Sequence, residues 1–334
     1  MPPPTEKLLQ ELNPGEHFTG FVAIRVLHVR QKRDGSPYLA LEFSDRSGRM
    51  SGNVWDNVEE FKKVLKVGQV VKLHGSITTY QDKKQITIEK LRPARPEDPV
   101  DKTRLIQTSQ RSQDEMRRHL RRLIEGVENA DIRSFLRRFF DDPEISEKYF
   151  DAPAGKLWHH AYLGGLAEHS LNMAEILLKV SEFYPNANRD LLVTGALLHD
   201  IGKIYEYQWD VSIDFSDRGR LIGHIVIGQE LLNLHRQKDP EMPEEIWNQI
   251  IHMVLSHQGK YEHKTPILPA TLEAVLLYCA DLMDSKANAF NRIIQRSREQ
   301  GDRWSEYIKL ADTFLFAGDE EPQKGEGSQE DTLF

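Results

Sequence analysis

Residues 195–203 read Gly-Ala-Leu-Leu-His-Asp-Ile-Gly-Lys, an apolar helical segment that ends in an adjacent histidine and aspartate, His199 and Asp200. Neighbouring residues of an α-helix diverge by about 100° around its axis. Both side chains can therefore meet one ion only if that ion lies in a groove between helices. The segment predicts a helical fold packed around a polar site.

Further histidines and acids fall on apolar helix faces around this segment. Thirteen histidines are present, and nine of them lie between residues 159 and 263. The helical neighbours of His169 at −3 and +4 are apolar, so its side chain is expected on a buried stripe. Asp281 interrupts another apolar helix. His224 and His257 stand in the short motifs GHI (223–225) and SHQG (256–259).

Buried histidines and aspartates are costly unless they are paired or coordinate a cation. A single histidine on an apolar face is usually a hydrogen-bonded core residue, but the joint pattern is harder to explain in that way. We therefore predict a bound cation. Three histidines match no pattern and are expected to be ordinary surface or core residues: His235, His252 and His263.

The N-terminal part reads differently, as short strands separated by turns. Five strands are predicted near residues 21–29, 38–43, 50–55, 70–75 and 85–91, with a short helix over 58–65. Five strands with a helix between the third and the fourth is the order of an OB-fold barrel. Phe21 and Phe43 are expected in its core.

The chain therefore combines α and β structure in several domains. We predict a five-stranded OB-fold β-barrel over residues 14–95 and a proline-rich linker over 96–111. An all-α part follows, as a helical connector over 112–150 and a helical domain over 151–316. The polar, acidic residues 317–334 are expected to be a disordered tail.

Composition and sequence pattern exclude several kinds of structural site and of membrane segment. The 334 residues carry a net charge of −8 and a single cysteine, Cys279, which excludes an internal disulfide and a cysteine-based zinc site. No run approaches the roughly 18 apolar residues that span a bilayer, and the first residues resemble no secretory signal. We expect a cytoplasmic location and no membrane partner. Residues 14–95 hold 15 basic and 9 acidic side chains, so a basic barrel sits in an acidic chain.

The ordered series His169, His199-Asp200, His224, His257 and Asp281 resembles the HD-domain superfamily of metal-dependent phosphohydrolases. With an OB-fold ahead of it, the chain is similar to the YhaM-like 3′–5′ exoribonuclease family from about residue 14 to 316. The motifs that carry this likeness are WHHAY (158–162), LHDIGK (198–203), GHI (223–225), SHQG (256–259) and ADLMDSK (280–286). The family often has a second histidine where this chain has Gln258.

The resemblance implies that His169, His199, Asp200 and Asp281 are the primary metal ligands, and that residues 151–316 form an HD domain. One or two divalent ions are implied, with Mn²⁺ favoured and Co²⁺, Fe²⁺, Zn²⁺ or Mg²⁺ compatible. His224 and His257 either hold a second ion, with Asp200 as a bridge, or hydrogen-bond the scissile phosphate.

Other side chains are candidates for contacts with substrate. Lys203 either reaches a phosphate oxygen or is a solvated helix-end lysine, and His160 and Lys286 are weaker candidates. Single-stranded nucleic acid is held by basic grooves and stacked aromatic rings. The barrel offers such side chains at six positions: Arg33, Tyr38, Trp55, Tyr80, Lys83 and Lys84.

These features predict a metal-dependent 3′–5′ exoribonuclease that hydrolyses single-stranded RNA, with single-stranded DNA left open as a second substrate. Asp200, Lys203, His224 and His257 would be its catalytic residues. One alternative is an HD phosphohydrolase of free or cyclic nucleotides, and another is a non-catalytic nucleic-acid-binding protein with a structural metal. The direction of digestion comes from the resemblance alone, and a homo-oligomer is left open.

Overall fold

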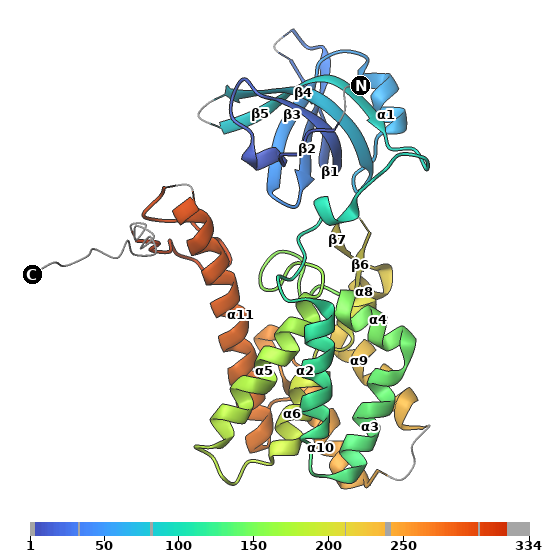
Figure 1. Cartoon of the computed structure of the whole chain (residues 1–334), viewed down its shortest axis with the longest axis vertical. Coiled ribbons are helices and arrows are strands. Elements are labelled where there is room, and N and C mark those ends of the chain that lie inside the picture. The colour runs from blue at the N-terminus through green and yellow to red at the C-terminus, as the bar shows by residue number, and fades with distance from the viewer. Residues whose placement is uncertain are drawn as a thin grey trace, which may run out of the picture.

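A closed β-barrel and a mainly helical domain follow one another along the chain and lie one above the other in Figure 1. This computed structural model describes residues 4–32, 34–80, 83–210, 212–237, 242–299 and 301–318. The predicted fold class, an OB-fold barrel followed by a helical domain, is confirmed. Arg33 and residues 319–334 of the predicted tail lie outside the described residues.

The barrel consists of five strands in the order β1-β2-β3-β5-β4. Their bounds are β1 His17–Gln31, β2 Pro37–Asp45, β3 Gly48–Val54, β4 Val70–Tyr80 and β5 Lys83–Pro93, with helix α1 (Val58–Val64) between β3 and β4. Side chains alternate across each strand, so Val22 and Ile24 of β1 enter the core, as does Phe43 of β2. Phe21 points outward beneath the ammonium of Lys72, 5.5 Å from its ring. The prediction that Phe21 is a core residue is therefore wrong.

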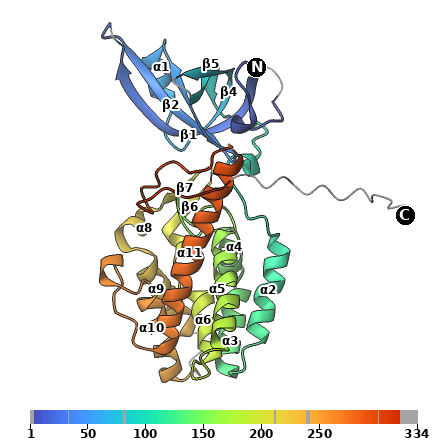
Figure 2. The same ribbon diagram turned by 90° about the vertical axis from the view of Figure 1, so that its left-hand side faces the viewer.

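The helical domain is built around α5 (Gly165–Ser181) and α6 (Arg189–Leu198), as Figure 2 shows. The other helices are α2 Gln113–Glu125, α3 Ala130–Asp141, α4 Pro143–Asp151, α7 Lys203–Glu206, α8 Asp217–Ile222, α9 His224–Arg236, α10 Glu244–Ser256 and α11 Leu272–Glu299. The 3-10 turns are η1 Leu9–Glu11, η2 Lys102–Arg104 and η3 Tyr261–His263. A small β-hairpin, β6 (Tyr207–Trp209) with β7 (Ile213–Phe215), is an exception to the expected all-helical fold.

The segment between barrel and helices packs against both. Leu105 and Ile106 are buried with Ile213 of the β6–β7 hairpin, and Val70 of the barrel packs against this cluster. The backbone amide of Arg46 also donates to the carbonyl of Arg104, at 2.8 Å. The connection therefore fixes the barrel to the β6–β7 hairpin. The domain boundaries predicted from the sequence remain predictions.

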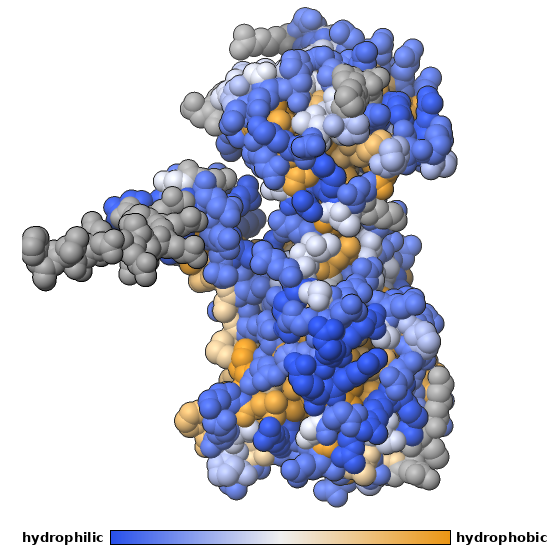
Figure 3. Space-filling view, in the orientation of Figure 1, coloured by the Kyte–Doolittle hydropathy of each residue, from blue (hydrophilic) through white to orange (hydrophobic). Residues whose placement is uncertain are grey.

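The surface in Figure 3 is largely hydrophilic over both the barrel and the helical domain, and smaller apolar patches are scattered among the hydrophilic residues. Among the helices of the described ranges, none is both long enough and apolar enough to cross a membrane.

Candidate metal centre

The six side chains that the resemblance marks as ligands converge from five helices. His169 lies on α5, His199 is the C-cap of α6 and Asp200 follows it in the turn before α7. His224 is the first residue of α9, His257 is the C-cap of α10 and Asp281 lies within α11. Because α6 ends at Leu198, the turn brings His199 Nε2 within 3.3 Å of Asp200 Oδ2.

Glycine at position 202 makes this convergence possible. A Cβ atom on Gly202 would lie 1.9 Å from the carbonyl oxygen of His224 and 2.6 Å from the amide nitrogen of Gly228. Only a residue without a side chain lets α9 approach so closely. The Gly of the LHDIGK motif therefore brings His224 to the Asp200 carboxylate.

Asp200 divides the ligands into two groups. Its Oδ2 atom lies 3.3 Å from His199 Nε2 and 3.7 Å from His169 Nε2, and the latter atom lies 3.4 Å from Asp281 Oδ1. The Oδ1 atom of Asp200 lies 3.4 Å from His224 Nε2 and 3.6 Å from His257 Nε2. The ligand atoms of His169, His199 and Asp281 lie within 4.8 Å of one another, and so do those of Asp200, His224 and His257, so each set is close enough together to share one cation. Asp200 is thus placed as a bridge between two potential cation positions.

All four histidines of the centre turn Nε2 inward and Nδ1 toward an oxygen atom. The Nδ1 atoms lie 2.7 Å from Asp284 for His169, 3.0 Å from the Ala196 carbonyl for His199, 3.0 Å from Glu206 for His224 and 2.6 Å from the Val254 carbonyl for His257. A carbonyl oxygen can only accept, so it fixes Nδ1 as the donor and leaves an unprotonated Nε2 on the neutral ring. This is the arrangement of metal-binding histidines.

Two observations test whether the residues fit a cation. The Nε2 atoms of His169 and His199 face one another at 3.3 Å, so a proton or a cation must separate their lone pairs. Asp200 Oδ1 and His224 Nε2 are buried and have no hydrogen-bond partner among the described residues, which costs about 1–3 kcal/mol for each atom. Imidazole and carboxylate donors suit a divalent transition metal, so the residues fit the ion.

The electrostatics keep the acids ionised. Burial opposes the charge of Asp200, but the neighbouring charges of Lys203 and His199 hold the pKa of its carboxyl well below the usual range. Burial also opposes a charge on His169, yet hydrogen bonds to Asp281 and Asp284 raise its pKa to about 9. Burial and the neighbouring His199 lower the pKa of His257 to about 3. The centre thus presents charged oxygens, a His169 ring that holds a proton between these acids, and a neutral His257. A bound cation would displace the proton of His169.

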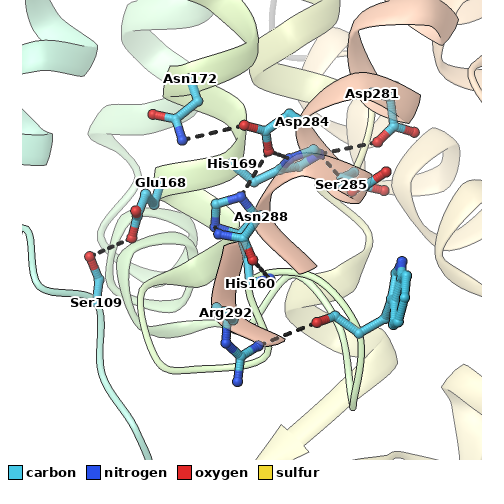
Figure 4. A network of polar contacts seen from close by, with 12 residues as sticks. Ser109, His160, Glu168, His169, Asn172, Asp281, Asp284, Ser285, Asn288 and Arg292 are labelled. Atoms are coloured by element: carbon cyan, nitrogen blue, oxygen red, sulfur yellow. Dashed lines mark hydrogen bonds and ion pairs between the residues drawn. The ribbon is translucent and has the colours of Figure 1, made fainter. Parts of the chain in front are cut away.

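Asp284 is a residue that the sequence reasoning missed. Its Oδ2 atom accepts from His169 Nδ1 at 2.7 Å and from His160 Nε2 at 2.8 Å, as Figure 4 shows. Its Oδ1 atom lies 3.4 Å from Asn172 Nδ2. The signal that could have revealed it is the spacing from Asp281, since residues three apart share a helix face.

Two further residues were missed. Glu206 is buried, accepts from the amide and the ring of His224, and orients that imidazole. No sequence spacing marks it, because its partner comes from another helix. His159 has both ring nitrogens buried with no partner among the described residues, and its ring centroid lies 5.5 Å from that of His169. The pair His159-His160 in the WHHAY motif was the available signal.

The structure places the predicted substrate contacts of the helical domain unevenly. Lys203 is 5% exposed and donates to Asp200 Oδ2 at 2.6 Å, so it is not a solvated helix-end lysine. His160 is fully buried and bonded to Tyr162 and Asp284, and a direct grip on substrate does not fit this position. Lys286 is exposed on α11. Gln258 Nε2 lies 3.0 Å from His257 Nε2.

On the barrel, two of the predicted aromatic residues form a platform. The rings of Tyr38 and Trp55 stack at 4.8 Å, Trp55 is half exposed, and the Lys32 ammonium lies 5.8 Å from the Trp55 ring. Tyr80 and Lys83 are exposed on adjacent strands. Lys84 instead donates to the carbonyl oxygens of Gln10 and Leu12, where it holds the N-terminal segment rather than a free groove.

The fold and the site together define an HD-domain hydrolase that carries an OB-fold barrel. The sequence matches the HD domain family over residues 166–286 and the OB-fold nucleic acid binding domain family over residues 22–94. A match to a solved OB-fold domain of replication protein A from Methanococcus maripaludis covers 28% of this chain and 96% of that domain, at 17% identity and a TM-score of 0.22.

Curated relatives identify the particular family. A Listeria innocua protein named 3′-5′ exoribonuclease YhaM is 32% identical over 298 residues, which cover 88% of this chain and 93% of that protein. A protein of the same name from Oceanobacillus iheyensis is 33% identical over 282 residues, covering 84% and 88%. The chain belongs to the YhaM family of 3′–5′ exoribonucleases.

Proposed function

We propose that this chain is a metal-dependent 3′–5′ exoribonuclease that hydrolyses single-stranded RNA. The observation that carries the proposal is the centre itself, where four histidines turn Nε2 toward the two oxygens of Asp200 or toward one another. The names of the relatives supply the substrate and the direction.

His169, His199 and Asp281, with Asp200 Oδ2, would hold one divalent ion, and Asp200 Oδ1, His224 and His257 would hold a second. A divalent ion at such a site supplies a nucleophile at neutral pH and positive charge against the phosphoryl oxygens. Mn²⁺ is the ion that we favour, and the donor set also suits Co²⁺, Fe²⁺ or Zn²⁺, with Mg²⁺ a poorer match.

The tautomer of His257 supports a ligand role over a hydrogen bond to phosphate. Its Nδ1 donates to the Val254 carbonyl, so the neutral ring has no proton at Nε2 to give to a phosphate oxygen. The contact between Gln258 Nε2 and His257 Nε2 agrees with an accepting nitrogen. Lys203 fixes the Asp200 carboxylate and keeps positive charge beside it.

The barrel would hold the strand that enters the centre. Bases can stack on Tyr38 and Trp55, with Lys32 beside them and Tyr80 and Lys83 exposed on β4 and β5. Base stacking contributes roughly 1–3 kcal/mol per base and tolerates any sequence. Because stacking does not distinguish ribose from deoxyribose, we include single-stranded DNA as a second substrate.

A time course with 5′-labelled and 3′-labelled RNA, with and without Mn²⁺, tests this function. We expect the 5′-labelled strand to shorten progressively, the 3′-labelled strand to release its label at once, and both reactions to stop without metal. Release of the 5′ label first would contradict the direction, and equal rates without metal would contradict the metal centre.

A further inference from the structure

A second group of possible metal ligands lies on the barrel, outside the catalytic centre. His17 of β1, His74 of β4 and Glu89 of β5 lie on three adjacent strands. Glu89 Oε1 lies 3.4 Å from His17 Nδ1, and Glu89 Oε2 lies 3.2 Å from His74 Nε2. The ligand atoms all lie within 4.8 Å of one another.

The strand register places these side chains together on the outer face. His17 pairs with Ser76 and Thr19 with His74, so the two histidines are diagonal neighbours. Glu89 falls in a β-bulge, since Gly75 pairs with Ile88 and His74 pairs with Lys90. A bulge turns its extra residue out of the regular alternation, and here it directs Glu89 toward both imidazoles.

Glycine allows the strands to approach at this bulge. A Cβ on Gly75 would lie only 2.2 Å from the carbonyl oxygen of Thr87. The site therefore depends on a local backbone arrangement rather than on three long side chains that meet by chance.

The His74 ring is already held in the orientation of a ligand. Its Nδ1 lies 2.8 Å from the Thr19 hydroxyl and 3.2 Å from the Phe18 carbonyl, which leaves Nε2 for Glu89. The side chain of His74 is only 13% exposed, whereas that of His17 is 62% exposed. The His17 ring stacks on that of His74 at 6.1 Å and 24°, so one ligand is fixed and a second can close over the ion.

We propose that His17, His74 and Glu89 bind one transition-metal ion, of which Zn²⁺ is the representative. Two imidazoles and one carboxylate form a zinc-type donor set that leaves a position for water. Such an ion would join β1 to β4 and β5 and brace the barrel. The site is separate from the aromatic platform, because Tyr38 pairs with Arg30, at the opposite end of β1 from His17.

Equilibrium dialysis of the full chain against Zn²⁺ tests the site, with bound metal measured per chain. We expect His17→Ala to bind one equivalent fewer than the wild type. Glu89→Gln, which keeps the shape of the side chain, should weaken this equivalent by at least about 10-fold. His28→Ala is the matched control, since His28 is an exposed histidine on the same strand.

Thermal unfolding gives a second readout. Without metal the variants should unfold at a temperature similar to that of the wild type. Added Zn²⁺ should raise the midpoint temperature of unfolding in the wild type and in His28→Ala, and it should raise it less in His17→Ala and Glu89→Gln. Equal stoichiometry and equal thermal shifts in wild type and His17→Ala would overturn the proposal. An equal loss in His28→Ala would also overturn it, because it would mean nonspecific binding to surface histidines.

Discussion

Replacement of Asp284 by asparagine should weaken metal binding at the catalytic centre without disrupting the fold. One oxygen of Asp284 accepts hydrogen bonds from both His169 and His160. Burial opposes its charge, but these hydrogen bonds hold the pKa of Asp284 well below the usual range, so the group is an anion. Asparagine keeps the size but removes the charge that orients His169.

The expected magnitude follows from two estimates. Loss of a residue that orients a metal-binding histidine typically costs 10–100-fold in metal affinity, which equals about 1.4–2.8 kcal/mol. A hydrogen bond to a charged group contributes about 1.5–3 kcal/mol. We therefore expect the Mn²⁺ dissociation constant of Asp284→Asn to rise about 10–100-fold.

Mn²⁺ titrations of binding and of RNA hydrolysis measure this effect. Asp302→Asn, an exposed aspartate beyond α11, serves as the control. The expected pattern is a higher Mn²⁺ requirement with a turnover rate that recovers at saturating metal. Unchanged Mn²⁺ affinity would refute the positioning role, and so would a lost turnover rate that excess Mn²⁺ does not restore.

Three further changes test other parts of the structure. Gly202→Ala places a Cβ 1.9 Å from the carbonyl oxygen of His224, so the free energy of unfolding in urea should fall by about 1–3 kcal/mol. Wild-type stability would contradict the close approach of α9 to Gly202. Trp55→Ala should weaken binding of single-stranded RNA by about 1–3 kcal/mol in fluorescence polarisation, while the unfolding temperature stays that of the wild type. Unchanged affinity would show that the Tyr38–Trp55 platform does not bind substrate. Lys203→Met leaves the buried Asp200 carboxylate without its lysine partner, so the free energy of unfolding of the metal-free chain should fall by about 3–5 kcal/mol in thermal unfolding. Mn²⁺ should restore part of this loss, and an unchanged unfolding midpoint would contradict the ion pair.

The sequence predicted the fold well because its signals are local. The order of strands around the helix 58–65 defined the barrel, and alternating apolar residues defined its inner face. Phe21 was misplaced because residues 21–24 are all apolar, so the alternation that marks the inner face elsewhere is missing there. The β6–β7 hairpin was missed because each strand has only three residues.

The site was predictable only in part, for a physical reason. The expected ligands stand out in sequence because polar residues interrupt apolar helices, and the structure brings all six together. Asp284 and Glu206 acquire their roles through contacts with histidines from other helices, which no local pattern encodes. His160 and Lys84 were expected at substrate, but tertiary contacts already use their polar atoms.

The activity and bound metal of an Asp200→Ala variant test most directly whether an Asp200-centred metal site hydrolyses RNA. Asp114→Asn, an exposed acid on α2, serves as the control. We expect Asp200→Ala to lose both the bound Mn²⁺ and the hydrolysis of a single-stranded oligoribonucleotide, while the control keeps both. Wild-type hydrolysis by Asp200→Ala would contradict the site and the proposed reaction together.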